Sequence, residues 1–364
     1  MLSKESVTYS KAIGILLMVL GHCSCSIPYV TQVLYMFHMP LFFFLSGYCF
    51  KEKYLYAPKQ FVLRRMKGLY WPYVKWSMFF LCFHNLFFSL NIYNATYGKV
   101  MGSDHLYDYQ DFIDRAIWIP THMTGHDQLL GAYWFMRALF LGSLFAFILL
   151  LIKEKIVRRY HVKESYLDIG SLVVTISISV LINHFRFIVP YFHCGSQPSL
   201  AASFILIGFF FKKYKIGKFS WHLSLLSFFV VFLGSFFWRS DMNSLYYENG
   251  KMVPFVITGV LGTWVVYSLP WETIGKRLSS FFNYIGTHTL QILTWHFLSF
   301  KITSLCIILL YDLPIEHLAE FPVIESFSNQ YWGFYFVTGV IVPLAITELF
   351  NLLCMRLGIL KTRS

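Results

Sequence analysis

The sequence predicts an all-α integral membrane protein with about ten transmembrane helices and with both termini in the cytoplasm. Three observations lead to this fold class: an extreme composition, a series of long apolar segments and a one-sided distribution of basic residues. The 364 residues are 57% hydrophobic and only 13% charged. A soluble domain of this length has no core large enough to bury so much apolar surface, so lipid must be the main solvent of the chain.

The apolar segments set the number of expected spans, because a helix needs about 20 apolar residues to cross a hydrocarbon layer of roughly 30 Å. Ten segments approach this length. In chain order they are residues 12–27, 29–50, 69–91, 132–152, 167–189, 198–211, 219–238, 252–271, 284–310 and 332–355.

The boundaries of these segments give further expectations. The first segment has no small-residue cleavage site after it and leads directly into the second, so we expect a retained helix rather than a removed signal. The first and the sixth are short, which favours little tilt and thinned or protein-lined surroundings. Because few residues follow the last segment, we expect one transmembrane domain over residues 1–364 and no separate soluble domain.

The loops between the segments predict the orientation. Most of the 30 Lys and Arg residues fall in alternate loops, which the positive-inside rule assigns to the cytoplasm together with both termini. Carboxylates concentrate in the opposite loops. The basic residues on the inner side are Lys4, Lys11, Lys51, Lys53, Lys59, Arg64, Arg65, Lys67, Lys153, Lys155, Arg158, Arg159, Lys163, Lys212, Lys213, Lys215, Lys218, Lys276, Arg277, Arg356, Lys361 and Arg363.

The distribution of charged residues and of cysteines argues against two kinds of ligand. The formal net charge of +12 comes from bursts of basic residues between apolar segments, so we expect no nucleic-acid partner. The seven cysteines lie mostly inside apolar segments, and the Cys23-x-Cys25 pair lacks the partners that a metal site needs. We therefore expect no metal.

Titratable side chains at membrane depth are costly and usually face a protein-lined interior, so they indicate candidate functional residues. Lys75, His184 and Arg186 lie near predicted interfaces and are interpreted as anchors. His22 follows Lys11 by eleven positions, which places its imidazole roughly 16 Å farther along a helix, near the middle of the bilayer. A catalytic and a buried structural role both remain open for His22.

Two patterns around His22 are more specific. Ten residues separate Lys11 from His22, and a second run follows, Phe37-His38-Met39-Pro40-Leu41-Phe42-Phe43-Phe44-Leu45-Ser46-Gly47-Tyr48. In these motifs the chain resembles acyltransferase family 3, bacterial membrane proteins that include O-acetylases of lipopolysaccharide, capsule and other surface glycans. The resemblance covers the whole chain, with Trp134-Phe135 at the start of the fourth segment and a histidine in the ninth.

The chain departs from the family pattern at two places. Lys11 stands where the family usually has arginine, and a lysine lacks the bidentate fork that suits a phosphate. The paired arginines of the first cytoplasmic loop appear as Arg64-Arg65, and the spacing Arg64-x-x-Lys67 matches only in part.

The resemblance implies transfer of an acyl group, usually acetyl, from cytoplasmic acetyl-CoA to a hydroxyl of a glycan or other acceptor at or across the membrane. A donor with several phosphates needs cations, and we assign this role to Lys11, Arg64, Arg65 and Lys67. We assign the general base to His22, because an alcohol needs a group that takes its proton. Direct attack in a noncovalent complex is preferred over an acyl-histidine intermediate.

Four further residues are candidates for binding the acceptor. His38 precedes Met39-Pro40, where we expect a break in the helix, so it either orients the acceptor or braces the break. Trp134, Arg137 and His296 are assigned to an acceptor cavity, since aromatic faces stack on sugars and a cation steadies an anionic glycan or a developing oxyanion. A structural role for each of them stays open.

Two other functions compete with the enzyme. Buried histidines and broken helices also mark a transporter or flippase of a glycan or lipid-linked intermediate, although the chain has no inverted repeat. A structural partner in a glycan-assembly complex is the third alternative. In each case we expect a multi-pass protein of the inner (plasma) membrane in contact with lipid. The identity of the acceptor and the length of the acyl chain do not follow from the sequence.

Overall fold

The computed structural model describes residues 2–99, 102–124, 127–242 and 250–356. Regular structure in these ranges is helical, apart from an isolated antiparallel bridge between Val189 and Cys194. Six of the described helical stretches are long and apolar enough to cross a membrane: residues 30–48, 128–160, 164–184, 252–273, 289–311 and 325–356. The all-helical membrane class is confirmed. The count of ten spans and the side of the termini stay predictions, and Lys361 and Arg363 lie outside the described residues.

The main helices overlap each of the ten predicted segments. They are α1 (Lys4–His22), α2 (Val30–Tyr35), α3 (His38–Tyr48), α4 (Pro58–Arg65), α5 (Trp71–Ser89), α6 (Tyr109–His122), α7 (Trp134–Tyr160), α8 (Glu164–His184), α9 (Ser196–Lys213), α10 (Trp221–Phe237), α11 (Met252–Ser268), α12 (Lys276–Thr287), α13 (Thr289–Tyr311) and α14 (Glu325–Arg356). Short helical turns join several of them: η1 (Glu52–Leu55), η2 (Met66–Tyr70), η4 (Gln128–Tyr133), η5 (Tyr191–His193), η6 (Trp271–Thr273) and η7 (Ile315–Ala319).

The first helix begins eight residues earlier than the first apolar segment. The hydroxyl of Ser3 accepts a hydrogen bond from the backbone N–H of Ser6 at 3.0 Å and so caps the helix, which starts at Lys4. Apolar content marks only the part of a helix that lies in lipid, so the predicted boundary missed the capped first turns. Lys11 consequently lies inside α1, and His22 is its last residue.

The second segment contains a break, but not at Met39-Pro40 as expected. The chain leaves helical geometry at Phe37, with φ of −146°, and resumes at His38, so α2 and α3 are separate helices. Pro40 lies in the first turn of α3, where a missing N–H costs nothing because such groups have no partner within the helix. The proline therefore helps to start α3 rather than interrupting it.

Two glycines hold α3 tightly against α9. A Cβ atom on Gly47 would clash with the carbonyl oxygen of Ile205, and one on Gly208 would clash with the carbonyl oxygen of Phe44. Small residues allow this close approach of backbones, which is the usual way to pack helices in lipid. The contact fixes α3 in the interior, where it carries residues of the candidate site.

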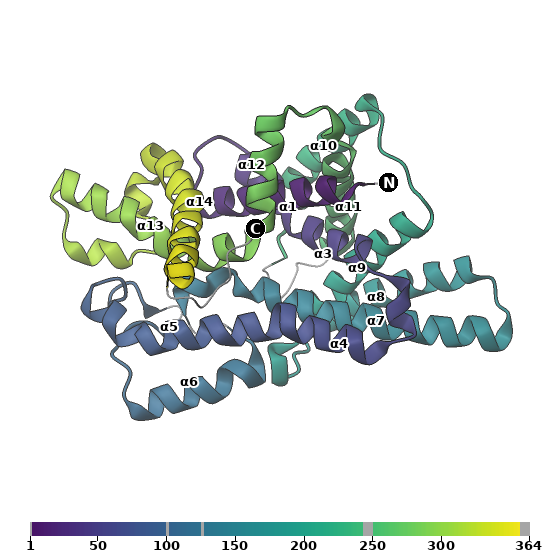
Figure 1. The fold of residues 1–364 in the computed structure, drawn as a ribbon, viewed down its shortest axis with the longest axis horizontal. Coiled ribbons are helices and arrows are strands. Elements are labelled where there is room, and N and C mark those ends of the chain that lie inside the picture. Colours follow the sequence, from purple (N-terminus) through teal and green to yellow (C-terminus); the bar gives the residue numbers. More distant parts are fainter. Residues whose placement is uncertain (1, 100–101, 125–126, 243–249, 357–364) are drawn as a thin grey trace.

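Contacts from the segment after α3 to α7 and α9 gather basic residues at one end of the helix bundle, which we call the basic end. The hydroxyl of Tyr56 donates to Glu154 at 3.3 Å, and Nζ of Lys212 donates to the carbonyl oxygen of Phe50 at 3.0 Å. In Figure 1 the N-terminus and the turn between α7 and α8 lie on the right, whereas the connection between α5 and α6 lies on the left.

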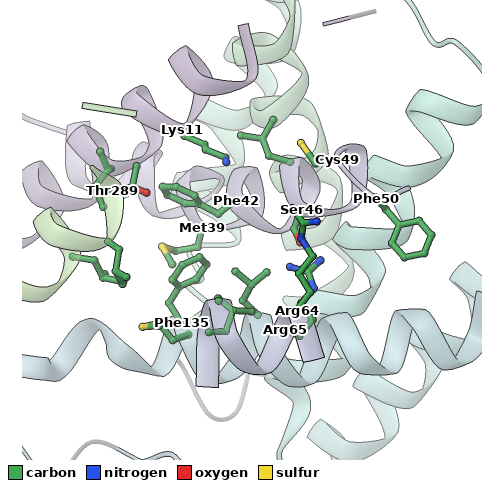
Figure 2. Close-up of a pocket in the computed structure, with 18 of the residues that line it drawn as sticks. Lys11, Met39, Phe42, Ser46, Cys49, Phe50, Arg64, Arg65, Phe135 and Thr289 are labelled. Carbon is green, nitrogen blue, oxygen red and sulfur yellow. The ribbon is translucent and has the colours of Figure 1, made fainter. Parts of the chain in front are cut away.

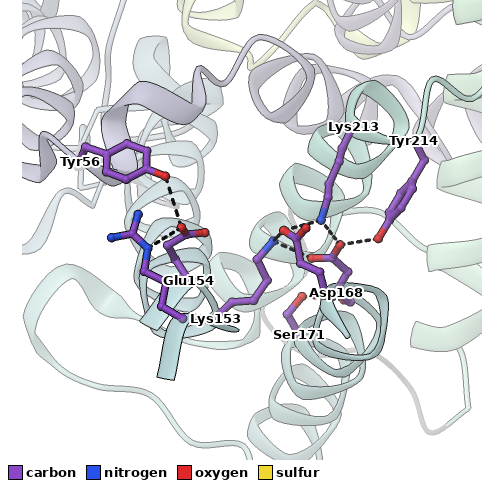
Figure 3. Close-up of polar contacts among 9 residues, drawn as sticks. Tyr56, Lys153, Glu154, Asp168, Ser171, Lys213 and Tyr214 are labelled. Atoms are coloured by element: carbon purple, nitrogen blue, oxygen red, sulfur yellow. Dashed lines mark hydrogen bonds and ion pairs between the residues drawn. The ribbon is translucent and has the colours of Figure 1, made fainter. Parts of the chain in front are cut away.

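A buried ionic cluster locks α7, α8 and α9 together at the basic end (Figure 3). The carboxylate of Asp168 accepts hydrogen bonds from Nζ of Lys153 at 2.8 Å, from Nζ of Lys213 and from the hydroxyl of Tyr214 at 2.5 Å. Lys153 and Asp168 expose only 4% and 3% of their side chains. In a buried pair of this kind, removing one residue leaves the charge of the other buried without a counter-charge.

One nearly continuous helical rod runs from α4 through η2 into α5 beside α7 (Figure 1). η2 is a π-helical turn, a wider winding that recurs at functional sites. α6 packs back against α5, and the hydroxyl of Tyr70 donates to the carbonyl oxygen of Pro120 at 3.0 Å. Because α6 starts at the far end of α5 and ends near its beginning, the loop that contains α6 folds back along the bundle.

Candidate active site

A cavity of about 480 Å³ opens among α1, α3, α4, η2, α7 and α13 (Figure 2). Most of its walls are apolar, formed by Met, Phe, Leu and Ile side chains. Four cationic side chains line it as well, and no carboxylate is among the described lining residues. The cavity therefore joins a positive region to an apolar one, which suits a ligand with an anionic head and a slender uncharged arm.

Three of these cations are residues that the sequence assigned to the donor site: Lys11, Arg64 and Arg65. Figure 2 shows Lys11 on one wall and the two arginines on the opposite side, below Ser46. The Nη1 of Arg64 donates to the hydroxyl of Tyr54 at 2.8 Å, and the Nη2 of Arg65 donates to the hydroxyl of Ser46 at 3.0 Å. Neither arginine is held by a carboxylate in the described salt bridges.

Burial lowers the pKa of the Arg65 guanidinium to about 10, and the adjacent charge of Arg64 acts in the same direction. The group remains protonated at neutral pH. Two like charges side by side without an acidic partner favour the binding of an anion, because an anion relieves their mutual repulsion. Lys67, the fourth predicted donor residue, is exposed on η2 and is not among the residues that line the cavity.

The apolar part of the cavity extends from the cations toward the middle of the bundle. Met18 of α1 and Leu293 of α13 line it there, together with Phe42 and Phe135. One helical turn beyond Met18 stands His22, and one turn beyond Leu293 stands His296. The cavity thus leads from the cations toward a pair of histidines.

His22 and His296 are in direct contact. The Nδ1 of His22 lies 3.2 Å from the Nε2 of His296, and the ring of Phe297 packs against both, with centroids 4.8 Å from His22 and 4.0 Å from His296. His296 is fully buried, whereas His22 keeps part of its surface exposed. His22 is therefore the member of the pair that a second molecule can reach.

His38 is the first residue of α3 and lies at the break between α2 and α3. Its Nδ1 donates to the carbonyl oxygen of Leu34 at 2.7 Å, and its ring meets the edge of Tyr35. The carbonyl of Leu34 belongs to the last turn of α2, so the contact braces the break. This geometry matches the structural alternative for His38, and a role in binding the acceptor stays a prediction.

Trp134 and Arg137 begin α7 and do not line the cavity. Trp134 is partly buried, and Arg137 is buried with 4% of its surface exposed. The Nη2 of Arg137 donates to the amide oxygen of Gln197 at 2.9 Å, while its Nε has no hydrogen-bond partner in the described structure. An acceptor role for both residues remains a prediction.

Several residues that line the cavity were not predicted from the sequence. Lys51, Tyr54 and Thr289 line the cavity without belonging to a recognised motif, and Gly68 lines it from η2. Ser46 lies within the run at 37–48, which was the one available signal for it. Among the described residues no group of three or more His, Cys, Asp or Glu side chains is arranged to hold a metal ion.

Comparison with known proteins identifies a family. A family model described as an acyltransferase domain matches residues 4–348, nearly the whole chain. No curated protein and no solved structure matches the chain.

Proposed function

Because the chain belongs to acyltransferase family 3, we propose that it is a membrane-bound O-acyltransferase that uses acyl-CoA, first of all acetyl-CoA, as its donor. The observation that carries this proposal is the cavity. Lys11, Arg64 and Arg65 line its positive part, and His22 lies one helical turn beyond Met18, which lines its apolar part. A coenzyme A thioester has the matching form, since its phosphates lie at one end of a slender arm and its reactive carbonyl at the other.

In this proposal the protein lies in the inner membrane with its basic end in the cytoplasm. The donor enters the cavity from that end. The phosphates contact Lys11, Arg64 and Arg65, and the exposed Lys67 adds positive potential at the entrance. The uncharged arm lies along Met39, Phe42 and Phe135. This placement brings the thioester carbonyl toward His22.

The chemistry needs one base and no covalent enzyme intermediate. His22 takes the proton from the hydroxyl of the acceptor while the hydroxyl oxygen attacks the thioester carbonyl carbon. The carbon–sulfur bond then breaks, and the departing thiolate takes the proton back from His22. The products are an ester and a free thiol, and the histidine returns to its neutral state.

The acceptor comes from the end opposite to the basic end, and we propose a hydroxyl of a surface glycan or its precursor. Trp134 and Arg137 lie in the first turn of α7 and outside the donor cavity, and we assign them to the acceptor. His38 stays a weaker candidate because its Nδ1 already binds the carbonyl oxygen of Leu34.

One experiment separates the enzyme from a transporter and from a structural partner. Purified protein in liposomes is incubated with acetyl-CoA labelled in the acetyl group and with extracted surface glycan. We expect label in the glycan with the wild type and none with His22→Ala. Movement of glycan across the liposome without label transfer would favour the transporter, and neither activity would leave the structural partner.

A further inference from the structure

The ring of His296 is fixed by its own helix. Its Nδ1 lies 3.1 Å from the carbonyl oxygen of Ile292 and 3.0 Å from that of Leu293, and the side chain is fully buried. Carbonyl oxygens only accept hydrogen bonds, so Nδ1 of His296 must carry a proton and donate it. In the neutral ring the other nitrogen, Nε2, then holds a lone pair.

That lone pair points at His22. The Nε2 of His296 lies 3.2 Å from Nδ1 of His22, and the two ring planes differ by 17° with centroids 5.3 Å apart. Rings at this separation whose nitrogens come so near lie edge to edge, which is the geometry of an in-plane N–H···N hydrogen bond. Since Nε2 of His296 has no proton to give, Nδ1 of His22 must be the donor.

We propose that His296 is a positioning residue that holds His22 in the tautomer with its proton on Nδ1 and its lone pair on Nε2. This inference rests on the proposed function, because it names the atom of His22 that acts as the base. It replaces the acceptor-binding role that the sequence suggested for His296. Fixing the tautomer through the second ring nitrogen is a general way to orient a histidine.

The pair has a second consequence during the reaction. When Nε2 of His22 takes the proton of the acceptor hydroxyl, the ring becomes positively charged, and its Nδ1–H bond to His296 strengthens because the donor is now ionised. The charge disappears when the departing thiolate takes the proton from Nε2. His296 keeps its own proton on Nδ1 throughout, so atoms and charges balance within His22, the acceptor and the donor.

The kinetic test uses two substitutions of His296. His296→Leu removes the acceptor of the Nδ1 proton, and His296→Gln supplies an amide oxygen that can accept it. We expect kcat of the leucine variant to fall about 10–100-fold, the usual loss when the partner of a functional histidine is removed, with both KM values unchanged. The glutamine variant should regain most of the loss.

His84→Leu is the matched control. His84 is also a buried histidine that donates to a backbone carbonyl, but it lies on α5 and contacts Tyr93 and Tyr107 rather than His22. The kcat of the His84→Leu variant should stay at the wild-type value. A raised KM for the acceptor with unchanged kcat in His296→Leu would return His296 to acceptor binding. Equal activities of the leucine and glutamine variants would reduce it to a packing residue.

A measurement without turnover keeps this inference separate from the proposed function. Solid-state nitrogen-15 NMR of histidine-labelled protein in bilayers, with His22→Gln used to assign the signals, reports which nitrogen of His22 is protonated. We expect the proton on Nδ1 in the wild type and a mixture of tautomers in His296→Leu. A proton on Nε2 in the wild type would overturn the inference even if acyl transfer is confirmed.

Discussion

The Nη2 of Arg65 donates a hydrogen bond to the hydroxyl of Ser46, 3.0 Å away. Ser46 belongs to the run at 37–48 on α3, and Arg65 ends α4, so the contact joins two motifs that the sequence presents separately. Both residues line the same cavity. An arginine that is already held loses less side-chain freedom when it binds a ligand, and binding is correspondingly tighter.

The first prediction concerns the arginine pair. Replacing Arg64 and Arg65 by alanine should raise the KM for acetyl-CoA roughly tenfold or more, since a hydrogen bond to a charged group contributes about 1.5–3 kcal/mol. Turnover at saturating donor should stay near the wild-type value, because phosphate contacts are equal in the ground and transition states. Initial rates against donor concentration measure both quantities.

Arg158→Ala serves as the control for that prediction. Arg158 lies at the same basic end, is 57% exposed and pairs with Glu154 outside the cavity. Its loss should leave the donor KM unchanged. An unchanged KM together with a collapsed turnover number in the Arg64 and Arg65 variant would remove these arginines from the docking site.

The second prediction fills the cavity without touching a charge. A Cβ atom on Gly68 would have no heavy atom within 4 Å, and this glycine lines the cavity. Gly68→Trp should therefore fold, place its ring in the cavity and weaken acetyl-CoA binding strongly, as measured by equilibrium binding of labelled donor. Gly170→Trp is the control, because Gly170 has equally open space but lies on α8 away from the cavity. Equal donor binding by both variants would place the donor elsewhere.

The third prediction concerns topology. Single cysteines near Lys59, Lys155 and Lys213 should react only with membrane-permeant reagents in intact cells, and cysteines near Asp108 and Glu320 should also react with impermeant ones. The background must first lose the exposed cysteines Cys49, Cys82 and Cys306. Labelling of positions 59 and 108 from the same side would contradict the ten-span topology.

The fourth prediction concerns stability. Asp168→Ala leaves Lys153 buried with only the half-exposed Glu164 as a counter-charge, so it should destabilise the protein by about 3–5 kcal/mol. Glu154→Ala removes the pair with the exposed Arg158 and the 3.3 Å hydrogen bond from Tyr56, and should cost only about 1 kcal/mol. Thermal unfolding of the detergent-solubilised protein measures both. Similar melting temperatures for the two variants would mean that the cluster adds little stability.

The sequence predicted most of what depends on local pattern. Each apolar segment of sufficient length overlaps a helix, although α4 and α6 lie outside all ten segments. Lys11 and the Arg64-Arg65 pair, both taken from sequence motifs, line two sides of the cavity, and His22 lies one helical turn beyond it. What failed was the position of helix ends, because capping by Ser3 and the start of α3 at His38 depend on single side chains rather than on hydropathy.

Contacts across large separations were beyond the sequence. His22 and His296 are 274 residues apart, and only the packing of α1 against α13 brings their rings together. Thr289 joins the cavity for the same reason. Tyr54 lies only ten residues from Arg64, but nothing in its local sequence distinguishes it from other polar residues near a helix end. A single sequence contains no information about which helices are neighbours.

The central claim is that His22 is the general base, and the most direct measurement compares acetyl transfer by wild type, His22→Ala and His184→Ala. His184 is an exposed histidine at the end of α8 and controls for the loss of a histidine as such. All three proteins should fold and bind acetyl-CoA equally. We expect transfer by His22→Ala to fall by about 10²–10⁴, the usual contribution of a positioned acid–base group, and transfer by His184→Ala to match the wild type. A folded His22→Ala protein that transfers acetyl at the wild-type rate would contradict the account.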